Sequence, residues 1–259
     1  MSDRITVHGL CVRETETGEA DKIITLVTEE QGRMSVSAKG VKSLKSRNMA
    51  ATQPFCYSLF TLKKSKKYYY IEESELIESF WDLRSDIDKM SLGAYICDVC
   101  ADVSVENSPD PELLRLTLNT LYAIAKGWDR RKVKAAFELR CASVIGFCPD
   151  LGVCGACGEE IACDGYLDIM NGRLLCKSCK PRAEIEEEIE GSTSRLYMLI
   201  THSVIDAMRY IVGAAPERFL SFSLGEDDMY LLSNAAETYL INHLEHSFHT
   251  LVFYKSVLF

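Results

Sequence analysis

The sequence predicts an α+β protein, in which a small amino-terminal β-barrel precedes a mainly α-helical region with an inserted zinc ribbon. Three features predict it: short β-rich segments up to residue 73, a helical hydrophobic period after residue 81, and two CxxC pairs. At 259 residues and 47% hydrophobic, the chain can build packed cores. We expect a barrel domain over 1–80, helical parts over 81–150 and 183–259, and the ribbon over 151–182.

The barrel is predicted from five short segments rich in β-branched and aromatic residues. Turn residues such as Gly18, Gly32 and Gly40 separate several of them, and no long helical pattern intervenes. This pattern is typical of a small closed barrel of the OB or SH3 type, and such barrels commonly bind nucleic acid on one strand face. The expected strands cover residues 5–12, 22–28, 33–38, 55–62 and 67–71.

Apolar residues recur at helical spacing through most of the remaining chain. Cys97 and Cys100 lie on the apolar face of the first predicted helix, so we interpret them as core residues. The five glutamates within 184–190 indicate a solvated helix face. A capping residue and a first-turn proline, Asp110 and Pro111, mark one sharp helix start. The expected helices cover about 83–101, 110–126, 129–144, 192–212 and 227–248.

Four cysteines have the spacing of a zinc ribbon: Cys154, Cys157, Cys176 and Cys179. The segment between the pairs predicts a β-hairpin that turns at Asn171-Gly172. One structural Zn²⁺ per chain is the expected cofactor, because four protein ligands leave no position for substrate. Iron is the main alternative, redox or buried cysteines are another interpretation, and the nearby Cys163 leaves the ligand choice slightly open.

The amino-terminal segment lacks a secretory pattern, and no apolar run reaches the roughly 18 residues that cross a bilayer. We therefore expect neither export nor membrane insertion. Eleven cysteines without a secretory signal indicate reduced thiols and metal binding in a cytoplasmic protein.

Charge is divided unevenly along the chain, whose net charge is −9. Residues 1–70 contain twelve Lys and Arg against seven Asp and Glu, whereas the remainder contains seventeen against thirty-one. A basic amino-terminal module on an acidic body predicts that one face binds a polyanion.

Cations on mobile barrel loops can follow a phosphate backbone without reading bases, although a basic loop is often simply solvated. Tyrosines 68–70 alternate across a strand, where they either stack on bases or pack in the barrel. The candidate nucleic-acid-binding residues are Arg33, Lys39, Lys42, Lys45, Arg47, Lys63, Lys64 and Lys66.

Enzymatic function has little support in the sequence. It contains no GxxxxGK phosphate loop, no GxGxxG after a strand and no GxSxG elbow. His243, His246 and His249 recur every three residues and leave a zinc enzyme as an alternative, but such histidines are more often surface or helix-end groups. An RNA- or transcription-associated adaptor built on the barrel and ribbon is a second alternative.

The order of several short strings resembles the RecO family of bacterial recombination mediators. They are Gly18-Glu19-Ala20-Asp21, Glu30-Gln31-Gly32-Arg33, Ala38-Lys39-Gly40-Val41-Lys42, Gln53-Pro54-Phe55, Phe137-Glu138-Leu139 and the CxxC pairs. The resemblance covers nearly the whole chain, and the shared order makes it specific.

The resemblance implies an OB domain, a helical domain with a zinc motif, and no catalytic residues. It implies binding of single- and double-stranded DNA, annealing of complementary strands, and cooperation with RecR and single-stranded DNA-binding protein. RecA would then load onto the coated DNA, and the protein would be associated with the nucleoid. It places the DNA-binding loop at residues 33–47 and the zinc ligands at the four cysteines, while Arg130, Arg131 and Lys132 are candidates for partner binding.

Overall fold

The computed structural model describes residues 4–43, 45–65, 68–189 and 196–258. The chain forms two compact units. Residues 1–128 together with 248–259 make the first, called the barrel unit, and residues 129–247 make the second, called the ribbon unit.

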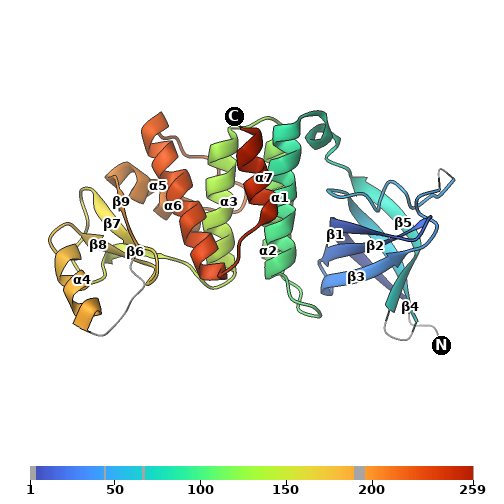
Figure 1. The fold of residues 1–259 in the computed structure, drawn as a ribbon, viewed down its shortest axis with the longest axis horizontal. Coiled ribbons are helices and arrows are strands. Elements are labelled where there is room, and N and C mark those ends of the chain that lie inside the picture. Colours follow the sequence, from blue (N-terminus) through green and yellow to red (C-terminus); the bar gives the residue numbers. More distant parts are fainter. Residues whose placement is uncertain (1–3, 44, 66–67, 190–195, 259) are drawn as a thin grey trace. The chain divides into compact units, whose positions relative to one another are not determined.

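The barrel unit begins with five strands that close in the order β1-β2-β3-β5-β4 (Figure 1). All neighbouring pairs are antiparallel except β3 and β5, which run parallel through the pairs Val36–Tyr69 and Ser37–Tyr70. The predicted five-stranded barrel is confirmed, with an OB-like strand order. Lys67, where the last strand was expected to begin, lies outside the described residues. The strands are β1 (Arg4–Thr17), β2 (Asp21–Thr28), β3 (Gly32–Ala38), β4 (Tyr57–Ser65) and β5 (Tyr68–Glu78).

Alternating side chains of these strands fill the barrel, as the period of a β-strand requires. In β3, for example, Met34 and Val36 are buried and Ser35 between them is exposed. Tyr69 and Ile71 of β5 pack against the same core from its margin. The buried cluster consists of Val7, Cys11, Ile24, Leu26, Met34, Val36, Ala51, Phe60 and Leu62.

Helices α1 (Ile87–Val103), α2 (Pro111–Ala125) and α7 (His249–Val257) complete the barrel unit after a short 3-10 turn, η1 (Trp81–Ser85). Helix α1 packs against both α2 and α7. Asp110 caps α2 by accepting from the Leu113 N–H at 2.9 Å, so the predicted start of this helix is confirmed. Cys97 and Cys100 are buried in the core as predicted, and burial raises the pKa of the Cys100 thiol to about 11.

The barrel is fixed to α1 through the β2–β3 turn. Gly32 has a φ of 66°, and a Cβ there would collide with the carbonyl oxygen of Val105. The backbone N–H of Arg33 donates to this same carbonyl at 3.1 Å, and its side-chain Nη1 donates to the Ala101 carbonyl at 2.9 Å. Arg13 of β1 forms an ion pair with Asp98 of α1.

The ribbon unit combines four helices with a four-stranded sheet of order β6-β8-β7-β9. β7 and β8 form the predicted antiparallel hairpin, and Gly172 in its turn has a φ of 62°. The strands are β6 (Asp150–Cys154), β7 (Gly165–Asp168), β8 (Arg173–Cys176) and β9 (Tyr197–Ile200), and the helices are α3 (Arg130–Val144), α4 (Lys180–Ile189), α5 (His202–Gly213) and α6 (Glu226–Leu244).

Two helix predictions were wrong in their extent. The helix expected from residue 192 begins only at His202, because residues 197–200 pair with β7 as strand β9; residues 192–195 lie outside the described residues. The helix expected over 227–248 ends at Leu244, because Glu245 adopts a left-handed conformation with a φ of 50°. The chain then continues into α7, which belongs to the barrel unit.

A buried ionic cluster joins α3 to α6. The Lys134 ammonium lies 2.7 Å from a Glu138 carboxylate oxygen and 2.8 Å from one of Glu237. Burial alone would lower the pKa of Lys134, but the two carboxylates outweigh burial and raise it. Lys134 therefore stays charged inside the ribbon unit.

We expect Lys134→Met to destabilise the ribbon unit by about 3–5 kcal/mol, because it removes the buried ammonium group that contacts both carboxylates. Hydrogen exchange of the α3 and α6 backbone amides measures this loss. Arg131→Met is the matched control: its ion pair with Glu226 is exposed and spans 4.0 Å, so the change should stay within about 0.5 kcal/mol. Equal protection in the Lys134 variant and the parent chain would contradict the assigned role.

Candidate nucleic-acid interface and metal centre

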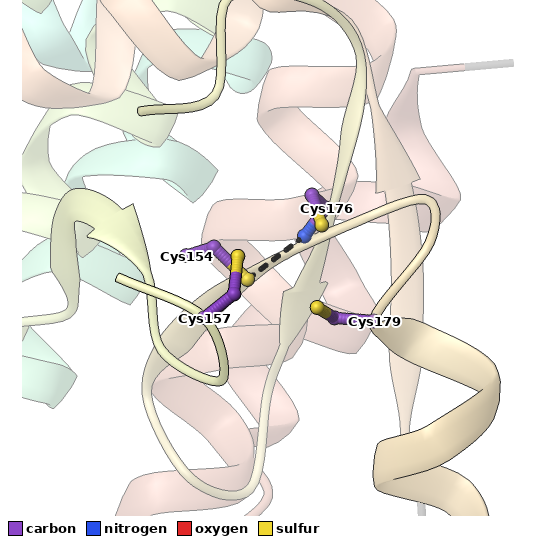
Figure 2. Close-up of side chains that lie close together, drawn as sticks. All are labelled: Cys154, Cys157, Cys176 and Cys179. Carbon is purple, nitrogen blue, oxygen red and sulfur yellow. Dashed lines mark hydrogen bonds between the residues drawn. The ribbon is translucent and has the colours of Figure 1, made fainter. Parts of the chain in front are cut away.

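The four predicted metal ligands converge at one end of the ribbon sheet (Figure 2). Cys154 ends β6, Cys176 ends β8, and Cys157 and Cys179 follow in the adjoining turns. Their Sγ atoms all lie within 4.8 Å of one another. Zn–S bonds of about 2.3 Å place the thiolates of a tetrahedral site a little under 4 Å apart, so modest closure around an ion completes it. The group fits a metal ion, and Cys163 is not part of it.

Backbone and hydroxyl donors favour the thiolate forms of two of these cysteines. Burial raises the pKa of Cys154, but backbone N–H donors outweigh burial, and the net effect is a lowered pKa. One of these donors is the Cys176 N–H, whose nitrogen lies 3.3 Å from Cys154 Sγ (Figure 2). A hydrogen bond with the Ser178 hydroxyl, at 3.1 Å, lowers the pKa of Cys176 to about 6. Gly158 has a φ of 75°, as its place after the first pair predicts, and its N–H donates to the Cys154 carbonyl. The donors to sulfur favour the thiolates of Cys154 and Cys176 only, because contacts with the Cys176 and Cys157 thiols raise the pKa of Cys179.

The strand register brings cations and tyrosines together at one end of the barrel, here called the basic end. Lys63 and Lys64 of β4 pair with Tyr70 and Tyr69 of β5, and Lys39 directly follows β3. The Lys39 ammonium lies 4.8 Å from the centre of the Tyr70 ring, and that of Lys64 lies 5.4 Å from the Tyr69 ring. Cation–π contacts of this kind hold the ammonium groups in place while leaving their charge uncompensated.

Carboxylates neutralise part of the predicted set. Lys42 pairs with Glu16 at 2.9 Å, and Lys63 lies 3.9 Å from Glu72, which also binds Arg4. Within the described residues, no carboxylate forms an ion pair with four other members of the predicted set: Lys39, Lys45, Arg47 and Lys64.

The other predicted DNA contacts have varied surroundings. Arg33 lies at the start of β3 rather than at the basic end, and α1 holds part of its guanidinium. Lys45 and Arg47 are exposed in the segment after β3, whereas Lys66 lies outside the described residues. Tyr68 is 66% exposed and offers a ring for stacking, while Tyr69 packs against the core. DNA binding by the whole set stays a prediction.

The three basic residues suggested for partner binding begin α3. Arg131 is exposed, but the Lys132 ammonium lies 4.8 Å from the Phe222 ring centre and donates to the Phe222 carbonyl. Burial lowers the pKa of Lys132. Arg131 is therefore more accessible to a partner than Lys132, and Arg130 is half-buried beside it.

The histidines of the alternative enzyme hypothesis do not gather around a metal position. His243 packs between Phe147 and Tyr239, with ring centres 5.1 Å and 4.2 Å away. It lines a pocket with Ile169, Met170 and Asn242. Within the described part of the chain, the groups suited to hold a metal include none of the three histidines considered.

Comparison with known proteins identifies the relatives of this chain. Residues 1–80 match the family model described as recombination protein O N terminal, and residues 84–251 match the one described as recombination protein O C terminal. The chain belongs to the RecO family. The DNA repair protein RecO of Acetivibrio thermocellus is 33% identical over 98% of this chain and 97% of its own length.

Further RecO relatives agree with this assignment. The protein of Caldicellulosiruptor bescii is 30% identical over 76% of this chain and 81% of its own length, and that of Bacillus pumilus is 30% identical over 75% and 76%. The RecO family supports a role in DNA repair and recombination. Among the described helices, none is long and apolar enough to cross a membrane.

Sequence reasoning missed how the basic end is organised. It treated the lysines as loop cations and did not pair them with the tyrosines or with Glu16 and Glu72. The pairing of Lys63 and Lys64 with Tyr70 and Tyr69 follows from the antiparallel register of β4 and β5, so an assumed hairpin register would have found it. The Glu16 contact joins residues 26 positions apart, and the sequence contains no signal for it.

We expect Cys154→Ser to lower bound metal well below one equivalent per chain, because a hydroxyl replaces a thiolate ligand. Elemental analysis of the purified chain measures this and also distinguishes zinc from iron. Cys163→Ser is the matched control, since Cys163 is an exposed thiol of the same ribbon outside the ligand group. Retention of a full equivalent by the Cys154 variant, or its loss from the Cys163 variant, would refute this ligand set.

Proposed function

We propose that this RecO chain binds single- and double-stranded DNA through the basic end of its barrel and anneals complementary strands without catalysing a covalent reaction. The supporting observation is that two lysine ammonium groups lie over tyrosine rings, Lys39 over Tyr70 and Lys64 over Tyr69. Strand annealing requires that the charge of two phosphate backbones be screened, and fixed, uncompensated ammonium groups provide that screening.

The exposed ring of Tyr68 lies two residues from Tyr70 on β5, so these two rings project from the same face of the strand. Base stacking on an aromatic ring contributes about 1–3 kcal/mol per base and tolerates any sequence. A surface that combines cations with one open ring suits sequence-independent binding, which a protein acting throughout a genome needs.

Membership of the RecO family extends the proposal to partners. With RecR, the chain would help RecA load onto DNA that single-stranded DNA-binding protein has coated, in the cytoplasm near the nucleoid. The exposed Arg131, with its neighbours Arg130 and Lys132, is a candidate contact for an acidic partner segment. The ion held by the four cysteines is Zn²⁺ in this proposal, and it stabilises the ribbon fold rather than a reaction.

Replacing both Lys39 and Lys64 should make the DNA-binding constant less dependent on salt concentration. Each phosphate contact contributes about 0.7 to the slope of log K against log salt for a single strand, so Lys39→Ala with Lys64→Ala should reduce the slope by about 1.4. Lys126→Ala is the matched control, because its ammonium also lies over a tyrosine ring, at 5.3 Å, but on α2. An unchanged slope in the double variant would place the DNA site elsewhere.

Annealing tests the proposed activity directly. The chain should accelerate pairing of complementary strands coated with single-stranded DNA-binding protein, and the double lysine variant should lose most of this acceleration because charge screening is lost. Fluorescence quenching between labelled strands follows the reaction. Tight RNA binding without any annealing would instead favour the RNA- or transcription-associated adaptor.

A further inference from the structure

A second group of potential metal ligands lies at the opposite end of the barrel strands from the basic end. It consists of His8, Glu29 and Glu30, here called the His8 cluster, whose ligand atoms all lie within 4.8 Å of one another. His8 belongs to β1, and the two glutamates form the turn between β2 and β3. The pairing of β1 with β2 through Gly9 and Thr28 brings these distant residues together.

Glu30 is held in place by the backbone of β1. The His8 N–H donates to Oε2 of Glu30 at 2.9 Å, while Oε1 lies 2.9 Å from the His8 ring nitrogen Nδ1. Ligand atoms bound to one ion through bonds of about 2.1 Å lie about 3–4 Å apart, so Nδ1 and Oε1 already have a suitable separation. A metal ion bound between these two atoms would replace their hydrogen bond.

Glu29 is held from the other side by Tyr57. The Tyr57 hydroxyl donates to Glu29 Oε1 at 2.6 Å, and the Glu29 N–H donates to the His8 carbonyl at 3.0 Å. Tyr57 therefore fixes a Glu29 oxygen within the same group of ligand atoms as Glu30 and His8. Hydrogen bonds to ligand carboxylates of this kind orient metal sites.

The carboxylates of the His8 cluster carry negative charge that no lysine or arginine of the described chain offsets. Within the described residues, no lysine or arginine forms an ion pair with Glu29 or Glu30. The side chains of His8 and Glu30 are 42% and 37% exposed, so an ion from solvent can reach them. An imidazole together with two carboxylates suits first-row divalent ions such as Zn²⁺ and Mn²⁺ better than Mg²⁺, which prefers oxygen ligands.

We propose that His8, Glu29 and Glu30 form a second metal site, distinct from the four cysteines, which binds one first-row divalent transition-metal ion. Three protein ligands leave coordination positions for water, so this site exchanges its ion more readily than the closed cysteine shell. The bound ion would offset the two negative charges at this end of the barrel.

Calorimetric titration of the full chain, with its cysteine site already filled by zinc, tests the proposal with Zn²⁺ as the probe. We expect one further equivalent to bind, and His8→Ala to weaken this binding at least tenfold. Glu30→Gln, which keeps the shape but removes a charge, should do the same. His202→Ala is the matched control, since His202 pairs with Asp206 at 3.3 Å but belongs to no ligand group of the described residues.

Amide resonances broadened by Mn²⁺ give an independent readout of position, and those of His8, Glu29 and Glu30 should broaden first. Thermal melts of the variants without added metal check that each one folds. Absence of a second equivalent in the parent chain would overturn the proposal and leave His8 and Glu30 as an ion pair only. Undiminished binding by folded His8→Ala, or broadening elsewhere, would equally overturn it.

Discussion

The short parallel pairing of β3 with β5 is the constraint on which the barrel and its basic end depend. Among the described residues, the pairs Val36–Tyr69 and Ser37–Tyr70 make it, and they close the sheet and remove its open edges. They also place the residue after β3, Lys39, over the ring of Tyr70. Since side chains alternate along a strand, the same register turns Tyr69 toward the core and leaves Tyr68 exposed. A one-residue slip would exchange these roles and separate cations from rings.

Local signals in the sequence were sufficient for most of the fold, and tertiary contacts explain the failures. Segments rich in β-branched and aromatic residues predicted the barrel, the Asp110-Pro111 cap predicted the start of α2, and cysteine spacing predicted the ligand group. Residues 197–200 were expected to be helical, but pairing with β7 overrides that local preference. The helix break at Glu245 has no glycine or proline that would predict it. Glu245 itself adopts the left-handed conformation, and the chain then continues into α7, which packs on α1.

The candidate sites also differ in how far the sequence predicts them. Ligands that are close in sequence, such as the two CxxC pairs, are predictable because a short hairpin brings them together whatever surrounds it. Arg33 was predicted from charge alone, which does not show that its side chain donates to the Ala101 carbonyl of α1. His8 meets Glu29 and Glu30 only through the β1–β2 register, more than twenty residues apart in sequence. Charge composition shows which residues are available, and strand register decides which of them act together.

The two ends of the barrel strands consequently differ in electrostatic character. At the basic end, Glu16 and Glu72 neutralise two of the lysines, and the uncompensated cations in the described part of the chain include Lys39 and Lys64, which lie over tyrosine rings. At the other end, two carboxylates converge beside His8 with no lysine or arginine paired to them among the described residues, and they repel a phosphate backbone. A polyanion approaching this barrel is therefore attracted to one end and disfavoured at the other, which orients it before any specific contact forms. Ion binding by the His8 cluster would weaken that repulsion, so metal occupancy and DNA orientation would be linked through charge alone.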